Sequence, residues 1–131
     1  MSAGYPRTVS ECLVHEHHGA VGYHHVNRAN MTATPAVARP QILLYERMPD
    51  GAYRLNGVEY IIPYTLLARE APAPVLLGQR MHREDTLNFW YLHVWVWRGN
   101  PDGVFANFHR DVACPPGQGK VYRPFERAGA E

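Results

Sequence analysis

The sequence predicts a mainly β fold, a small antiparallel barrel or strongly curled sheet that carries one or two short helices. Aromatic residues make up 11% of the chain and include eight tyrosines and three tryptophans. Such side chains are frequent in strands. Eleven glycines and eleven prolines supply turns. Five strand-like segments separated by these turns, with little helical pattern, favour a sheet that curls or closes on itself.

The length of the chain fits one domain. Its 131 residues have a mass of 14.9 kDa, and a chain of this size buries roughly two thirds of its unfolded surface. Apolar residues make up 46% and charged residues 19%, a balance that argues against wholesale disorder. We expect an irregular N-terminal arm at residues 1–18, a single β-rich domain at 19–114 and a loosely ordered tail at 115–131.

Two strands are predicted in the first third of the chain. Residues 19–27 are flanked by glycine and alternate in the manner of a strand. Residues 30–40 are small residues and prolines, which is typical of a connection. Residues 41–47 are mostly apolar and predict the second strand.

A hairpin follows the second strand. The turn at 48–51 contains a proline, which fixes φ, and a glycine, which supplies a positive φ. Residues 53–63 are expected to form the returning strand. Within it, Asn56 and Gly57 predict a bulge or a second tight turn.

The second half of the chain predicts one helix and one more pair of strands. Residues 64–70 are expected to form a short helix that two prolines end. Residues 78–88 are a polar connection. Residues 89–98 are the most strand-like segment of the sequence, and residues 99–103 form a turn. Residues 104–108 are expected to pair with that strand.

One carboxylate stands inside an apolar strand. Because side chains alternate between the two faces of a strand, Glu59 points away from Val58 and Tyr60. Burying a carboxylate without a partner is costly, so Glu59 predicts a cation, a set of donors or a metal beside it. His93 stands equally deep in its own strand.

A metal centre assembled from several strands is the leading hypothesis. Imidazole and carboxylate ligands suit one divalent transition metal, which is Zn, Fe, Mn, Ni or Cu. With an open coordination position, such a centre would be an enzyme that acts on a small organic molecule. The candidate ligands are His24, Glu59 and His93, with Glu46 or His25 as a further ligand. His24 and His25 are adjacent, so only one of them can face a shared interior.

Two other classes of function stay open. In the first, the protein is a metal-free binding protein or cyclase-like enzyme in which Glu59 is the catalytic acid or base. In the second, it is a structural or interaction protein that forms a homodimer through edge strands. A small-molecule pocket would have Tyr23, Trp95 and Gln79 as candidate wall residues.

Charge and hydropathy argue against two kinds of partner. Thirteen lysines and arginines balance twelve aspartates and glutamates, for a net charge of +1, whereas a nucleic-acid binder normally has a basic face. The longest apolar runs are far too short to span a membrane. No signal peptide is recognised at the N-terminus, which predicts a cytoplasmic protein.

Two cysteines lie near the ends of the predicted domain. Cys12 and Cys114 have no close Cys-x-x-Cys or Cys-x-His spacing that indicates zinc. They are either two reduced, buried thiols or a disulfide that closes a loop of about 100 residues. A disulfide would indicate an exported protein.

Several motifs follow an order that resembles a known family. They are Gly22–Asn27, Leu43–Glu46, Gly57–Tyr60, Leu77–Gln79, and His93–Trp97 followed by Asn100-Pro101 and Gly103. This order resembles a family of small uncharacterised bacterial proteins with the motifs Gly-Tyr-His-Tyr-Val-Asn, Leu-Leu-Tyr-Glu, Gly-Val-Glu-Tyr and His-Val-Trp-x-Trp. A more distant likeness is to the oil-body-associated proteins.

The resemblance covers residues 19–114 and brings no activity with it. It implies that His24, Glu46, Glu59 and His93 fall on matching positions. It also implies that Cys12 and Cys114 are a pair, because members of the family often look exported and carry cysteines there. This chain departs from the pattern at His25, where the family has tyrosine.

Overall fold

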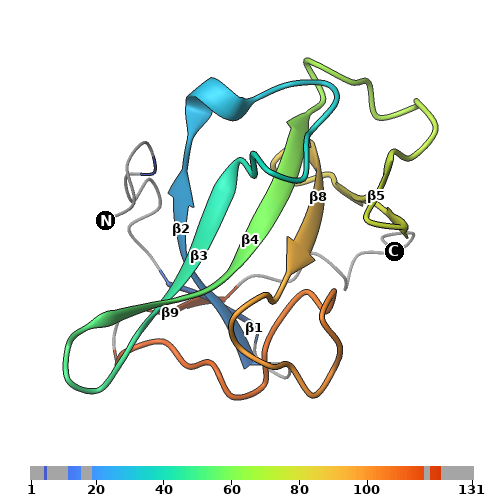
Figure 1. The fold of residues 1–131 in the computed structure, drawn as a ribbon. Coiled ribbons are helices and arrows are strands. Elements are labelled where there is room, and N and C mark those ends of the chain that lie inside the picture. The colour runs from blue at the N-terminus through green and yellow to red at the C-terminus, as the bar shows by residue number, and fades with distance from the viewer. Residues whose placement is uncertain (1–4, 6–11, 16–18, 117–118, 122–131) are drawn as a thin grey trace.

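A computed structural model describes residue 5 and the segments 12–15, 19–116 and 119–121. The structure is built from strands, with a single three-residue 3-10 helix, η1 (Arg28–Asn30), in the part described. Seven strands form one strongly curled, mainly antiparallel sheet (Figure 1). The predicted mainly β fold class is therefore confirmed.

The large sheet has the strand order β7-β8-β4-β3-β2-β1-β9. Neighbouring strands are antiparallel, except that β1 and β9 run parallel. Two further strands, β5 and β6, pair only with each other. The strands are β1 (Cys12–His15), β2 (Gly19–Val26), β3 (Ile42–Arg47), β4 (Tyr53–Pro63), β5 (Val75–Leu76), β6 (Gln79–Arg80), β7 (His82–Glu84), β8 (Phe89–Val94) and β9 (Gly119–Val121).

The hairpin β3–β4 matches the sequence prediction closely. Gly51 in its turn has a φ of 90°, a conformation that glycine adopts without strain. The register passes from Leu44 opposite Gly57 to Tyr45 opposite Leu55, so Asn56 is the extra residue of a bulge. The bulge bends β4, and the hairpin projects from the body of the sheet in Figure 1.

Each face of the curled sheet has its own apolar cluster. The alternation within β4 is as predicted, since Val58 and Tyr60 pack in one cluster while Ile61 packs in the other. Strand β8 alternates in the same way, with Leu92 in the first cluster and Tyr91 in the second. The first cluster also contains Tyr23, Leu43, Tyr45, Ile62, Trp90 and Val94. The second contains Val21, Ile42, Leu44 and Phe108, and the candidate site lies on this second face.

The two cysteines lie together at one edge of the sheet, beside β1 and β9. The sulfur atoms of Cys12, in β1, and Cys114 lie at disulfide distance, with Cα atoms 5.6 Å apart. Strand β1 was assigned to the predicted arm and β9 to the predicted tail, and both are strands of the large sheet. The rest of residues 1–18 and 115–131 lies mostly outside the described segments.

Three local predictions are wrong. Residues 64–70 form turns rather than a helix, because only Leu66 and Leu67 donate back to the carbonyl of Pro63 before the prolines intervene. Residues 104–108 form loops, and they contact the chain beyond β8 through Trp95 N–H and the Val104 carbonyl. The connection at 78–88 contains β6 and β7.

No helix in the described segments is both long enough and apolar enough to cross a membrane.

Candidate metal centre

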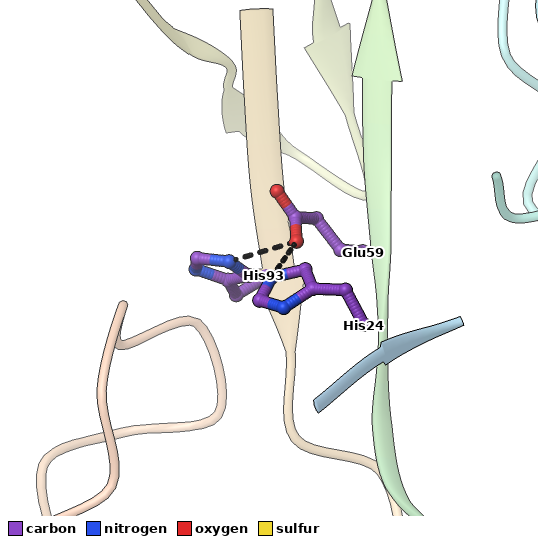
Figure 2. A group of neighbouring side chains, drawn as sticks. All are labelled: His24, Glu59 and His93. Carbon is purple, nitrogen blue, oxygen red and sulfur yellow. Dashed lines mark ion pairs between the residues drawn. The ribbon is translucent and has the colours of Figure 1, made fainter. Parts of the chain in front are cut away.

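Three strands of the large sheet bring one carboxylate and two imidazoles together. Glu59 on β4 stands directly opposite His93 on the neighbouring strand β8. His24 comes from β2, which is separated from β4 by β3. The imidazole of His24 nevertheless reaches the carboxylate of Glu59, as Figure 2 shows. Residues far apart in the chain thus form one compact group.

The carboxylate is shared between the two rings. Nε2 of His24 and Nε2 of His93 each lie 3.1 Å from the same atom, Oε1 of Glu59. In Figure 2 this oxygen lies between the rings, while the other carboxylate oxygen points away. The exposed fractions of His24, Glu59 and His93 are 7%, 3% and 6%. One ligand atom from each residue lies within 4.8 Å of the others, so the group can hold a metal ion.

The contacts within the group are close but not well-aligned hydrogen bonds. Among the described residues, Glu59 Oε1 and His24 Nδ1 are buried without a hydrogen-bond partner of good geometry. The two imidazoles still stabilise the oxygen as ion-pair partners at 3.1 Å, whereas Nδ1 of His24 is left without a partner in the described segments, which is costly for a buried polar atom. Three lone-pair atoms that converge without satisfying one another are the arrangement expected around a cation.

The electrostatics of the group keep its carboxyl ionised. Burial raises the pKa of Glu59, but in metal-free protein the charge of a protonated His93 and the contacts with both imidazoles outweigh burial and lower the pKa from 4.5 to about 2. The carboxylate is therefore charged throughout the neutral range, as a metal ligand must be. Metal binding would also require the two rings to be neutral.

This lowered pKa predicts how stability depends on pH in metal-free protein. Between pH 4.5 and pH 2 the unfolded chain binds the Glu59 proton and the folded chain does not, so the contribution of Glu59 is present above pH 4.5 and is lost as the pH falls towards 2. We expect the stability difference between wild type and Glu59→Gln to shrink over this window. Urea unfolding with a chelator present measures it, and a difference that stays constant would contradict the charge state.

Asn107 orients one of the rings. Its Oδ1 accepts a hydrogen bond from Nδ1 of His93 at 3.3 Å, which leaves Nε2 of His93 directed at the site with a lone pair. Removing such an outer partner lowers metal affinity about 10- to 100-fold. We expect that loss in Asn107→Ala and near wild-type affinity in Asn107→Asp, which retains the acceptor. Competition with a coloured chelator measures both, and equal affinity of all three proteins would exclude the orienting role.

A cavity of about 170 Å³ adjoins the three residues. His24, Glu59 and His93 form part of its wall, and most of the remainder is aliphatic or aromatic. Phe89 and Tyr91 contribute because they precede His93 by four and two residues on the same face of β8. Leu87, which is 58% exposed, also lines the cavity.

Glu46 lies apart from this group. Its Oε1 accepts a hydrogen bond from Asn56 Nδ2 at 2.9 Å and lies 3.4 Å from Nε of Arg98. The register explains the separation, because Glu59 stands opposite Ile42, four residues before Glu46 on β3. Four residues of a strand span about 13 Å.

His25 and Tyr23 point to the opposite face of β2. The ring of His25 packs 4.3 Å from that of Tyr45, and its Nδ1 lies 3.3 Å from the carbonyl oxygen of Tyr5. Tyr23 belongs to the first apolar cluster and meets the edge of Tyr53. His24, rather than its neighbour, is the histidine that faces Glu59.

Trp95 and Gln79 lie outside the cavity wall. Trp95 Nε1 donates to the carbonyl of Ala106, and its ring packs against His109, beyond the end of β8. Gln79 belongs to β6 and pairs with Leu76 in the separate small hairpin.

The sequence interpretation missed several residues of the site. Phe89 and Tyr91 share the face of His93, which alternation along the strand indicates, but neither was named as a wall residue of the site. Asn107 and Phe108 lie in a loop, where no periodic pattern indicates which way a side chain points. Their positions at the site follow from how this loop folds back, which the sequence does not indicate.

Comparison of the chain with protein-family models, with curated proteins and with solved structures finds no match. The class defined by fold and site is a strand-rich protein with a buried His/Glu/His group that can hold a metal. The resemblance to small bacterial proteins stays a prediction.

Proposed function

We propose that the protein binds one divalent transition metal ion through His24, Glu59 and His93 and acts as a metal-dependent enzyme on a small organic molecule. The observation that carries the proposal is the convergence of three buried ligand atoms within 4.8 Å. Two neutral imidazoles and one carboxylate suit Zn, Fe, Mn, Ni or Cu.

The state of the group without metal supports the proposal. Burying ionisable side chains is costly unless each has a partner. Here the shared oxygen has two imidazole nitrogens at 3.1 Å but no well-aligned hydrogen bond, and Nδ1 of His24 has no hydrogen-bond partner among the described residues. A divalent ion would take a lone pair from each of the three residues. It would also balance the buried negative charge of Glu59.

Three protein ligands leave coordination positions for water or substrate, which is the usual arrangement of catalytic rather than structural sites. Bound there, the metal would act as a Lewis acid or lower the pKa of a bound water. The chain itself would hold the substrate in the apolar cavity next to the three ligands. His93 would be held in position by Asn107.

The alternatives have less support. A carboxyl with a pKa of about 2 is a weak general base at neutral pH, which disfavours Glu59 as a metal-free acid or base. The edge strands β7 and β9 have three residues each, so they offer a short ladder to a second copy of the chain.

Cobalt(II) titration of metal-free protein tests the proposal, because cobalt in a site of low coordination number absorbs visible light. We expect absorption that saturates at about one equivalent and is displaced by zinc. Glu59→Gln should weaken binding by more than ~100-fold, beyond the loss typical of an outer partner. His82→Ala, a histidine outside the group, should titrate as wild type. Absence of saturable binding in wild type would overturn the proposal.

A further inference from the structure

The wall of the cavity restricts what can occupy it. Apart from the hydroxyl of Tyr91, the polar side chains that line it among the described residues are the three candidate ligands. The remaining wall comes from aliphatic and aromatic side chains such as Ile42, Ile61 and Phe108. No lysine, arginine, amide or serine from the described segments lines the space.

The volume sets the size of the occupant. At about 170 Å³ the cavity is similar to an apolar cavity of about 150 Å³ that accommodates benzene. It is well below the range of roughly 300 to 1,000 Å³ that drug-sized ligands occupy. One ring or a short branched chain fills it.

Building on the proposed metal centre, we infer that the substrate is a small, uncharged and mainly apolar molecule, about the size of one six-membered ring, with a single donor atom that binds the metal. The apolar body of such a molecule gains by leaving water for the cavity. Its donor atom is the polar group that the metal would satisfy.

The same wall disfavours other substrate classes. A sugar, an amino acid or a phosphate ester carries several polar or charged groups, and most of them would lose their hydration without finding a partner in this mainly apolar wall. That loss costs several kcal/mol for each unpaired polar group and more for a charge. The cavity therefore selects against them even though the metal alone would bind a phosphate or carboxylate.

Benzene, phenol, glycerol and inorganic phosphate are the probes that test the inference, each added to metal-free and to zinc-loaded protein with affinity measured by NMR titration. We expect benzene to bind both forms, and phenol to bind the zinc-loaded form at least about tenfold more tightly than the metal-free form. Glycerol and phosphate should bind at least tenfold more weakly than phenol.

The outcomes separate the two proposals. Protein that takes up one equivalent of zinc but binds neither benzene nor phenol would overturn the substrate class and leave the metal centre intact. Protein that binds benzene without taking up zinc would overturn the metal centre and the donor-atom part of the inference. Tighter binding of glycerol or phosphate than of phenol to the zinc form would also overturn the substrate class.

Filling the cavity provides a second test. Ile61→Phe should abolish phenol binding while zinc binding is retained. Val26→Phe should also abolish phenol binding and retain zinc, and because Val26 lies at the partly exposed end of β2, this position tolerates a larger side chain. Ile62→Val is the matched control, because Ile62 points to the opposite face of β4. Phenol binding that persists in both filled variants with zinc bound would place the ligand elsewhere and contradict the inference.

Discussion

His93→Ala is expected to lose the metal ion that wild-type protein binds. The substitution removes one of three ligands and leaves Glu59 with a single imidazole beside it. Since loss of an outer-shell partner alone costs about 10- to 100-fold in affinity, loss of a direct ligand should cost more than about 100-fold. His24→Ala should behave in the same way. Competition with a coloured chelator measures the affinities.

The control for this prediction is a histidine outside the group. His82 lies on β7 with its ring 5.2 Å from that of Tyr91, and His82→Ala should bind metal as wild type does. Equal losses in the His82, His93 and His24 variants would indicate general destabilisation rather than removal of ligands. Unchanged affinity in His93→Ala would exclude His93 as a ligand.

The double variant Cys12→Ala, Cys114→Ala is expected to be less stable than wild type by about 4 to 5 kcal/mol. The bond closes a loop across a sequence separation of 102 residues, and a cross-link of that span strongly restricts the unfolded chain. It also ties β1 to the segment that leads to β9. Small domains are stable by only about 5 to 15 kcal/mol, so the loss is a large share of the total. Urea unfolding measures it.

A reducing agent supplies the internal control. It should lower the unfolding midpoint of wild type and leave that of the double variant unchanged. A midpoint of wild type that does not respond to reduction, together with wild-type stability in the double variant, would show that the two cysteines are not bonded in solution.

Much of the fold was predictable because strands with alternating side chains are local features. The bounds of β4, Tyr53–Pro63, agree with the sequence prediction, as does the bulge at Asn56. Alternation also placed Glu59 on the face of its strand that points away from Val58 and Tyr60. The pairing of β4 with β8 then brings the carboxylate and the imidazole together.

The register between neighbouring strands, which decides which side chains lie next to one another, was not predictable from the sequence. Glu46 stands near the end of an apolar strand, which made it a candidate ligand in the sequence. The register of β3 against β4 instead positions its carboxylate beside Arg98, away from Glu59. The sequence also left His24 and His25 as alternatives, because it does not show which face of β2 is turned towards β4. Register and the curl of the sheet decide both cases.

Pairings between distant short segments were beyond the sequence as well. Strands β1 and β9 have four and three residues and are joined in parallel across almost the whole chain. Segments so short have no period that distinguishes them from loops. The loop that contains Asn107 likewise has no periodic pattern from which its structure could be predicted. One of its side chains nevertheless orients a candidate ligand.

Elemental analysis of protein purified without an affinity tag or chelator tests the metal centre most directly. The account predicts about one equivalent of a single transition metal in wild type and less than a tenth of an equivalent in His93→Ala purified in parallel. No metal in wild type, even after incubation with Zn, Fe, Ni, Mn and Cu salts, would contradict it, and His24, Glu59 and His93 would then be a buried ion-pair group of the core.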